Sequence, residues 1–329
     1  MSVQHPNMQL QLLKVSRWTW REVLTWVVAF ASPWLFPGHA LIVNEVAIVA
    51  LFALSLDLVL GYAGVVSLGH AAFLGFGAYT AALFAKHIMP DPFVGLCVGM
   101  AASTLLGSVF SLTILRGTDL TRLMVTLGLA LILLELANKL DWLTGGSDGL
   151  QGVLMGPVLG RFEFDLMGQT AATYSLTVLF LLFMAVRHWV HSPMGATVKA
   201  IRDNRLRASA IGINVNAKIA GAYTVAAALA GAAGALLAQT TGFVSLDIFA
   251  LDRSADVMLM LVIGGVGWLY GGLLGAVGFK LMHDVISSIT PQYWTFWIGL
   301  FLVVLVLVGR ERLIRPWLWF GAQRHGGSP

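Results

Sequence analysis

Long apolar stretches, each about as long as a helix that crosses a membrane, follow one another along most of the chain. Hydrophobic residues form continuous blocks, without the alternation of a half-buried strand or the polar face of a soluble helix. The blocks lie near residues 20–37, 41–60, 66–86, 93–115, 121–140, 169–187, 217–239 and 293–309. Each approaches the ~20 residues that span a bilayer as a helix. This pattern predicts an all-α polytopic integral membrane protein.

The apolar stretch at 255–286 differs from the others because glycines interrupt it. Its centre reads GGVGWLYGG, from Gly264 to Gly272. We expect about ten helical segments in all, some not fully crossing, with this stretch broken or re-entrant near 264–272. Small residues let membrane helices approach closely. The expected packing or hinge glycines are Gly61, Gly64, Gly264, Gly265, Gly267, Gly271 and Gly275.

Lysine and arginine distinguish the two sides of the membrane, because cytoplasmic loops carry an excess of both. If the N-terminus is inside, fifteen of the twenty basic residues fall on the cytoplasmic side: Lys14, Arg17, Arg21, Arg116, Arg122, Arg187, Lys199, Arg202, Arg205, Arg207, Lys218, Arg310, Arg312, Arg315 and Arg324. We therefore expect both termini in the cytoplasm. The number of crossings is then even, so the stretch at 255–286 enters the membrane and returns.

One transmembrane domain accounts for the whole chain, residues 1–329. We expect cytoplasmic tails at 1–19 and 310–329, an external loop at 141–168 and a cytoplasmic loop at 188–216. The polar start followed by an apolar stretch also resembles a cleaved secretory signal. No clear small-x-small cleavage site follows it, which favours an uncleaved first helix.

Composition supports the membrane assignment and narrows the partners. The chain is 58% hydrophobic and 11% charged, with a mean hydropathy of +0.82, whereas soluble domains carry about 25% charged residues. The net charge of +4 follows the loops, so we expect the lipid bilayer and no nucleic acid as a partner. The single cysteine, Cys97, excludes an internal disulfide and an all-cysteine metal site.

Motifs of catalysis are missing from the sequence. It has no G-x-x-x-x-G-K-[ST] loop for ATP, no HExxH and no CxxC. Residues 145–149 match G-x-S-x-G, but a nucleophile elbow needs a strand–turn–helix setting, and this loop joins two membrane helices. We therefore expect no catalytic residue, no metal and no cofactor bound by this chain.

A dense group of charges interrupts the apolar pattern in the loop at 188–216. Five of the ten residues in KAIRDNRLRA (199–208) are charged. We expect one exposed helix from Gly195 to Ile211, ended by a C-cap at Gly212. It carries a narrow apolar stripe of Val198, Ile201, Ala208 and Ile211. Either the charge anchors the loop at the membrane surface, or the helix docks into a groove of a soluble partner; the stripe and the defined ends favour docking.

Four segments, in order along the chain, resemble one transporter family. They are GYAGVVSLGHAAFLGFGAYTAAL (Gly61–Leu83), TGGSDGL (Thr144–Leu150), SPMGATVKAIRDNRLRASAIGINV (Ser192–Val215) and GGVGWLYGGLLGA (Gly264–Ala276). Together they resemble the LivM-type permeases of branched-chain amino-acid ABC importers. Three positions depart from the family pattern: Arg205 stands where an acid is common, Arg207 where alanine is common, and Asp57 where asparagine is common.

The resemblance implies a multi-pass permease subunit of the bacterial plasma (inner) membrane. The implied partners are a second, H-type permease, two ATPase subunits that use ATP and Mg²⁺, and a soluble substrate-binding protein. The third segment resembles the loop that couples to the ATPases, and its candidate coupling residues are Gly195, Lys199, Ile201, Arg202, Asp203, Arg205, Ala208 and Gly212.

The resemblance also implies a substrate, a branched-chain or related hydrophobic amino acid. Urea, amides and aromatic or carboxylate compounds stay open within the same importer class. The alternative from another class is an ATP-independent secondary transporter or channel, which matched broken helices in inverted repeats would favour.

Polar residues inside the apolar stretches are candidates for the substrate pathway, because such groups are costly in a membrane and mark pathways. They are Asn44, Glu45, Asp57, Ser67, His70, Thr126, Glu135 and Asn138. Three of them, Glu45, Glu135 and Asn138, lie toward outer helix ends, where an interfacial role is the alternative. A zwitterionic amino acid with an aliphatic side chain would need a mostly apolar path with few fixed charges, and this set fits such a path weakly.

Overall fold

Ten long helices make up most of the structure. The computed structural model describes residues 19–114, 119–165 and 167–308. Within those ranges there is no strand, and the long helices are α2 (Trp20–Leu35), α3 (Ala40–Asp57), α4 (Ala71–His87), α5 (Pro92–Ile114), α6 (Asp119–Lys139), α8 (Gln169–Val190), α11 (Val215–Thr241), α12 (Leu251–Gly264), α13 (Leu269–Ile289) and α14 (Trp294–Val308). This confirms the predicted all-α fold. The predicted tails at 1–19 and 310–329 lie almost wholly outside the described residues.

Six helices of the described chain are long and apolar enough to cross a membrane. They comprise α5, α6, α8, α11, α13 and the continuous helical stretch Ala40–Tyr62, in which the π-helix η2 (Leu58–Tyr62) extends α3. The other long helices are shorter, down to the 14 residues of α12. The expectation that some segments do not fully cross agrees with these lengths.

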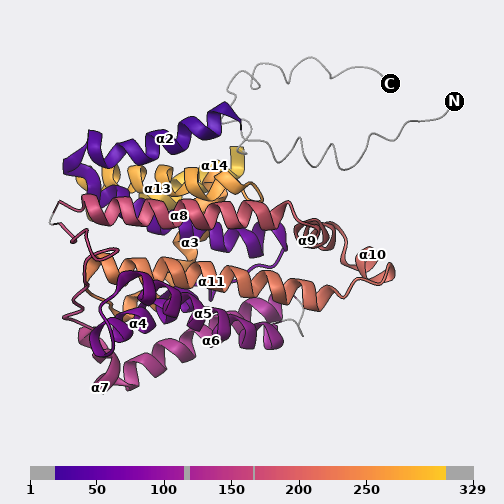
Figure 1. Cartoon of the computed structure of the whole chain (residues 1–329). Helices are drawn as coiled ribbons and strands as arrows, with labels where there is room; N and C mark the ends of the chain where they lie inside the picture. The colour runs from indigo at the N-terminus through magenta and orange to yellow at the C-terminus, as the bar shows by residue number, and fades with distance from the viewer. Residues whose placement is uncertain (1–18, 115–118, 166, 309–329) are drawn as a thin grey trace, which may run out of the picture.

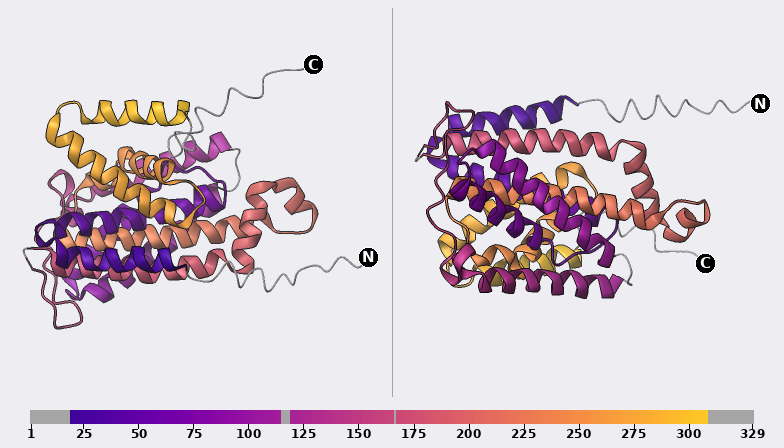
Figure 2. Two further views of the ribbon diagram at one scale, coloured as in Figure 1. Left: turned by 90° about the horizontal axis from the view of Figure 1, so that it is seen from above. Right: turned by 60° about the horizontal axis from the view of Figure 1, so that its bottom comes forward.

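The long helices lie side by side and leave two distinct ends. In Figure 1, α3, α8 and α11 run through the middle, with α4, α5 and α6 on one side and α2, α13 and α14 on the other. At one end α9 (Pro193–Asp203) and α10 (Arg205–Ala210) project beyond α8 and α11 (Figure 2). At the other end lie α7 (Asp141–Thr144), η3 (Gly146–Asp148) and the loop that leads to α8. We call these the α9 end and the loop end.

Helix α11 packs in the centre of the bundle against α3, α4 and α5. Its closest contacts fall on glycines, because a side chain there would meet backbone atoms. A Cβ on Gly234 would overlap the carbonyl oxygen of Leu74 in α4, and a Cβ on Gly77 in α4 would overlap Gly231. Lipid tails are as apolar as the side chains of a membrane helix, so the hydrophobic effect does not drive such helices together. Close packing of this kind holds them together instead.

Residues 63–70 correct the predicted third span. The apolar pattern placed a helix at 66–86, but α4 begins at Ala71 and the preceding residues are not helical. Non-helical backbone at membrane depth must have its polar groups satisfied by protein or water. Here Val65 N donates to the Val59 carbonyl at 2.9 Å, and Ala71 N donates to the Ser254 hydroxyl at 2.9 Å.

The glycine-rich stretch forms a pair of packed helices with a tight turn. Helix α12 ends at Gly264 and α13 begins at Leu269, so the break lies inside the predicted range 264–272. A Cβ on Gly271 would overlap the Gly265 carbonyl, and one on Gly275 would overlap the Met260 carbonyl. These glycines therefore let α12 and α13 touch.

The loop that follows α6 is tied to the loop end of the bundle. Leu150 and Val244 exchange backbone hydrogen bonds of 2.8 and 3.1 Å, and Gly156 N donates to the Pro90 carbonyl at 2.7 Å. The segment TGGSDGL forms the end of α7 and the single turn η3. The G-x-S-x-G match therefore lacks the strand of a hydrolase elbow, as its position between membrane helices predicts.

Candidate functional site: the α9–α10 segment and the Asp57 junction

The charged segment after α8 folds as two short helices, not one. Helix α9 ends at Asp203 and α10 begins at Arg205, because Asn204 between them is extended, with φ −159° and ψ 102°. The Asn204 side-chain oxygen accepts a hydrogen bond from Arg207 N at 2.9 Å and caps α10. Asparagine competes for backbone N–H groups in this way, which favours cap positions over helix interiors. The predicted unbroken helix from Gly195 to Ile211 is therefore wrong.

The C-terminal end of the segment has the predicted geometry. Gly212 has a left-handed φ of +84°, and the following residue, Ile213, donates its N–H to the Ala208 carbonyl at 3.1 Å. This is the hydrogen-bond pattern that a glycine C-cap allows. Gly212 ends the segment and turns the chain back toward α11.

Most of the apolar stripe on this segment packs against the subunit itself. Val198 and Ile201 are fully buried and Ala208 is 3% exposed, whereas Ile211 is 71% exposed. The stripe thus attaches α9 to the bundle, and only its last residue is open to a partner. An exposed leucine that the stripe did not include, Leu206, lies on α10 and is 85% exposed.

Arg202 reaches from α9 into the membrane helices. Its Nη1 donates a hydrogen bond to the carbonyl oxygen of Gly61 in η2, and its side chain packs over Gly64. Beside this contact, Gly267 N in the α12–α13 turn donates to Asp57 Oδ1 at 2.7 Å. We call Asp57, Gly61, Gly64, Arg202 and Gly267 the Asp57 junction.

Only glycine fits at three positions of the Asp57 junction. A Cβ on Gly61 would overlap the Asp57 carboxylate and lie 2.5 Å from Gly267 N. Gly64 and Gly267 have left-handed φ angles of +66° and +77°, which side chains other than hydrogen disfavour. The π-helix η2 supplies the carbonyl that Arg202 binds, and such π segments occur often at functional sites.

The Asp57 junction connects three pieces of the chain that are distant in sequence. Arg202 lies on α9, Asp57 and Gly61 lie on the helical stretch of α3 and η2, and Gly267 lies in the turn between α12 and α13. Energetic coupling between sites travels through contiguous hydrogen bonds and packed elements of this kind. Arg202 thus ties α9 to the end of α3, and Asp57 ties the end of α3 to the α12–α13 turn.

A second contact between α9 and the bundle lies beside the junction. The Lys199 ammonium is 5.2 Å from the centroid of the Tyr62 ring, a cation–π contact, and burial lowers the pKa of Lys199 below its usual value. These two residues line a cavity of about 170 Å³, and Glu22 and Arg187 line the same cavity. Glu22 and Arg187 form an ion pair of 3.0 Å that joins α2 to α8.

Replacing Asn204 with alanine is expected to fray α10. The substitution removes the side-chain acceptor of Arg207 N, a loss of about 1 kcal/mol. Hydrogen exchange of the amides of Arg205–Ala210 should accelerate by roughly five- to tenfold, while amides within α9 keep their protection. Asn204→Asp, which keeps an acceptor at the same place, is the control. Equal protection of α10 in the alanine variant would contradict the capping role.

The eight predicted pathway residues do not converge on one site. Four of them are buried inside the bundle with hydrogen-bond partners there: Asn44 bonds to Ser175 (2.6 Å) and Thr240 (3.1 Å), Ser67 to Tyr223 (3.4 Å), His70 Nε2 to Ser55 (2.9 Å) and Thr126 to the Leu123 carbonyl (3.0 Å). The other ring nitrogen of His70, Nδ1, is buried without a hydrogen-bond partner among the described residues. Glu135 and Asn138 lie exposed on α6, with Glu135 3.9 Å from Lys139. Asp57 belongs to the junction, and Glu45 lines a separate pocket.

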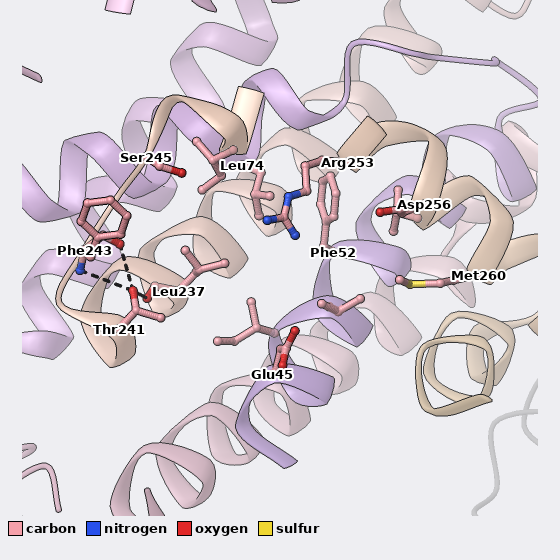
Figure 3. A pocket seen from close by; sticks show the side chains of 14 residues that line it. Glu45, Phe52, Leu74, Leu237, Thr241, Phe243, Ser245, Arg253, Asp256 and Met260 are labelled. Atoms are coloured by element: carbon pink, nitrogen blue, oxygen red, sulfur yellow. Dashed lines mark hydrogen bonds between the residues drawn. The ribbon is translucent and has the colours of Figure 1, made fainter. Parts of the chain in front are cut away.

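The pocket that contains Glu45 lies toward the loop end and has a volume of about 360 Å³ (Figure 3). Helices α3, α4, α11 and α12 form its walls, which are mostly apolar. Two charged residues of α12 also line it, Arg253 and Asp256, and neither was among the predicted pathway residues. Arg253, Asp256, Val257 and Met260 share one face of α12 at spacings i, i+3, i+4 and i+7, a pattern visible in the sequence.

Metal ligation finds no support in the described part of the chain. Its residues 19–114, 119–165 and 167–308 contain no group of three or more His, Cys, Asp and Glu side chains that could hold an ion. The structure instead offers three features: a segment that projects from one end, a junction that links this segment to the bundle, and a pocket toward the other end.

Comparison with protein families decides the class. A family model for the permease component of branched-chain amino acid transport systems matches residues 39–308, which is most of the chain. The chain belongs to this family. The match spans every long helix from α3 to α14 and includes the α9–α10 segment. The protein is therefore a multi-pass transport permease component, as the four sequence segments predicted.

Individual members of the permease family agree with this assignment. The chain is 28% identical over 318 residues to the high-affinity branched-chain amino acid transport system permease protein LivM of Salmonella typhimurium, covering 88% of this chain and 73% of that protein. It is 23% identical over 275 residues to LivH of Escherichia coli K12, covering 79% and 88%. The autoinducer 2 import system permease protein LsrC of Yersinia pseudotuberculosis is 29% identical over 257 residues, covering 75% and 66%. No solved structure matches the chain significantly.

Proposed function

We propose that this chain is the M-type permease subunit of an ABC importer for branched-chain or related hydrophobic amino acids in the bacterial plasma membrane. It forms the membrane pathway together with a second, H-type permease. Two ATPase subunits bind at the α9 end in the cytoplasm, and a soluble binding protein delivers substrate at the loop end. The observation that carries this proposal is the projecting α9–α10 segment, which Arg202 ties to the end of the α3–η2 stretch.

The exposed face of α10 fits a soluble partner better than a lipid surface. It presents Leu206 and Ile211, both more than two-thirds exposed, beside Arg207. An apolar anchor with a charged rim is how a short helix docks into a groove of another protein. A membrane anchor needs only the positive charge, whereas an apolar tip framed by charge is what a groove of a protein partner requires.

The substrate class rests on the relatives and on the pocket. Both LivM and LivH are named for branched-chain amino acids, and the pocket toward the loop end is walled mainly by aliphatic and aromatic side chains. LsrC is named for a different solute, so the family as a whole serves more than one substrate. Urea, amides and aromatic or carboxylate compounds are the competing substrates for an uptake assay.

Co-purification with candidate subunits tests the proposed assembly. The wild-type chain, expressed with an H-type permease and two ATPase subunits, should purify as one complex whose uptake in proteoliposomes requires ATP. Leu206→Asp combined with Arg207→Glu should remove the ATPases and lower uptake by about tenfold or more, because an anchor residue of an interface contributes ~2 kcal/mol or more. Arg202 is unsuitable for this test, since it binds inside the subunit.

The matched control is Leu154→Asp at the loop end, where the leucine is 81% exposed. This variant should keep the ATPases. Loss of the ATPases in both variants would indicate general misfolding and contradict docking at α10. Transport by the chain under an ion gradient, without any ATPase, would instead support a secondary transporter.

A further inference from the structure

The pocket toward the loop end is lined by a mostly apolar wall and by a few charged side chains. Its volume of about 360 Å³ lies within the range of small-molecule sites, ~300–1,000 Å³, which are mostly apolar with a few placed polar groups. Phe52, Leu74 and Met260 contribute to the apolar wall. Arg253 and Asp256 lie on one side of the pocket, and Glu45 lies across from them (Figure 3).

Arg253 is the group in this pocket that favours an anionic ligand. Its guanidinium makes no hydrogen bond or ion pair of ≤ 4.0 Å with any residue that the structure describes, and it points between Leu74 and Phe52 in Figure 3. A guanidinium beside apolar surface gains most from a carboxylate, which it can bind with two parallel hydrogen bonds. Arg253 also lies in the first turn of α12, where free backbone N–H groups favour negative charge.

Asp256 supplies the opposite charge one turn along the same helix. It lies half-buried, three residues after Arg253. The other acid of the pocket, Glu45, already pairs with Lys280 at 2.8 Å, and Lys280 also contacts Asp284 at 3.4 Å. Arg253 and Asp256 attract each other along α12, and His283 also attracts Asp256. Neither Arg253 nor Asp256 forms an ion pair across the pocket with the residues that the structure describes, and both lie next to an aliphatic and aromatic wall.

We propose that this pocket is a binding site for a zwitterionic α-amino acid with an aliphatic side chain, whose carboxylate binds Arg253, whose ammonium binds Asp256, and whose side chain packs on Phe52, Leu74 and Met260. The substrate class rests on the proposed function; the site and the roles of its residues go beyond it. Both charged ends of the ligand are recognised, so an amino-acid amide or a simple carboxylic acid of the same shape binds less well.

The same helices connect this pocket to the Asp57 junction. Helix α3 carries Glu45 near one end and Asp57 at the other, while α12 carries Asp256 and leads into the turn of Gly267, which binds Asp57. The two walls of the pocket are thus hydrogen-bonded to each other where Arg202 enters from α9. A movement of α9 changes the pocket by shifting α12 against α3.

Protection of a single thiol tests the site without depending on the ATPases. Ser245 lines the pocket and is partly exposed, so Ser245→Cys in a Cys97→Ser background places one reactive group there. L-leucine, at concentrations up to the millimolar range, should slow its reaction with a charged methanethiosulfonate by about fivefold or more. L-leucinamide and 4-methylpentanoate, which lack the carboxylate and the ammonium respectively, should protect much less. Adding Arg253→Gln should abolish the protection by leucine.

The control thiol is Ser288→Cys in the same background, on an exposed turn near the end of α13 and outside the pocket. Its reaction should be unaffected by leucine. Equal reactivity of Ser245→Cys with and without leucine would overturn the site, and so would protection that survives Arg253→Gln. Because this assay uses the purified permease pair, its failure is distinguishable from failure of the proposed importer, which is judged by ATPase binding and ATP-dependent uptake.

Discussion

Replacing Gly234 with valine is expected to lower the free energy of unfolding by about 3 kcal/mol or more. The Cβ alone would overlap the Leu74 carbonyl and lie 2.9 Å from Ala78 N. Both of these are backbone atoms of α4, so no side chain can rotate to make room. The helices must separate, and the separation removes the close contact of α4 with α11 on which the centre of the bundle depends.

The matched control is Gly128→Val on α6, where a Cβ would meet nothing within 4 Å. Both substitutions add the same side chain to a helix, so their shared loss of helix propensity cancels in the comparison. Thermal unfolding in detergent should place the Gly128 variant near the wild type and the Gly234 variant far below it, with poor recovery of folded protein. Equal stability of the two variants would show that the α4–α11 contact is looser than the structure indicates.

The helices were predictable because hydropathy and length are properties of each segment alone. The eight uninterrupted apolar blocks became eight helices and the stretch at 255–286 became two, and the break near Gly264 was visible as a cluster of glycines. The break at 63–70 was not visible in the same way. Val65, Val66 and Leu68 are as apolar as the helices around them, and α4 starts late because Ala71 N bonds to Ser254, 183 residues away.

The α9–α10 segment shows which features of a site can be predicted from a local sequence pattern. The charges of 199–208 identified the segment, but charge does not show which arginine faces inward. Arg202 does so because Gly61, Gly64 and Gly267 leave room for it, and those glycines come from two other parts of the chain. The unbroken helix was wrong at Asn204 for a local reason, since asparagine is a strong N-cap residue.

The pocket shows why single polar residues in apolar sequence are a poor guide to a binding site. Asn44, Ser67 and His70 stand out in apolar sequence, yet each bonds to a residue of a neighbouring helix, His70 through Nε2 alone. Arg253 and Asp256 lie at the start of an apolar stretch, beside Asp252 and Ser254, so neither stands out as an isolated polar residue in apolar sequence. The separation of i and i+3 that puts them on one face of α12 is in the sequence, whereas the wall contributed by α3, α4 and α11 is known only from the fold.

Replacing Asp57 with leucine is expected to uncouple uptake from ATP hydrolysis. The substitution leaves the part-buried Gly267 N without its acceptor, and an unsatisfied N–H away from water costs about 1–3 kcal/mol. That energy is lost from the contact between the end of α3 and the α12–α13 turn, where Arg202 enters. When this energy is lost from the coupling between ATP hydrolysis and transport, ATP-driven uptake falls by roughly 5–150-fold. ATPase binding at α10, which Asp57 does not touch, should be unchanged.

Asp57→Asn separates the hydrogen bond from the charge. Its amide oxygen can still accept from Gly267 N. We expect this variant to keep uptake within about threefold of the wild type. Uptake per ATP hydrolysed, measured in proteoliposomes with the complete complex, compares the two substitutions directly. Equal losses in both variants would assign the role to the negative charge and overturn the hydrogen-bond account.

A double-substitution cycle with Arg202→Gln then tests whether the junction acts as one unit. Arg202 and Asp57 bind adjacent groups, the Gly61 carbonyl and Gly267 N, and residues in one hydrogen-bond network show interaction energies of about 0.5–3 kcal/mol. The combined variant should therefore lose less coupling than the sum of the single losses. Strictly additive losses would mean that α9 acts on α3 and on the α12–α13 turn through separate contacts, so that movement of α9 would not shift the two walls of the pocket together.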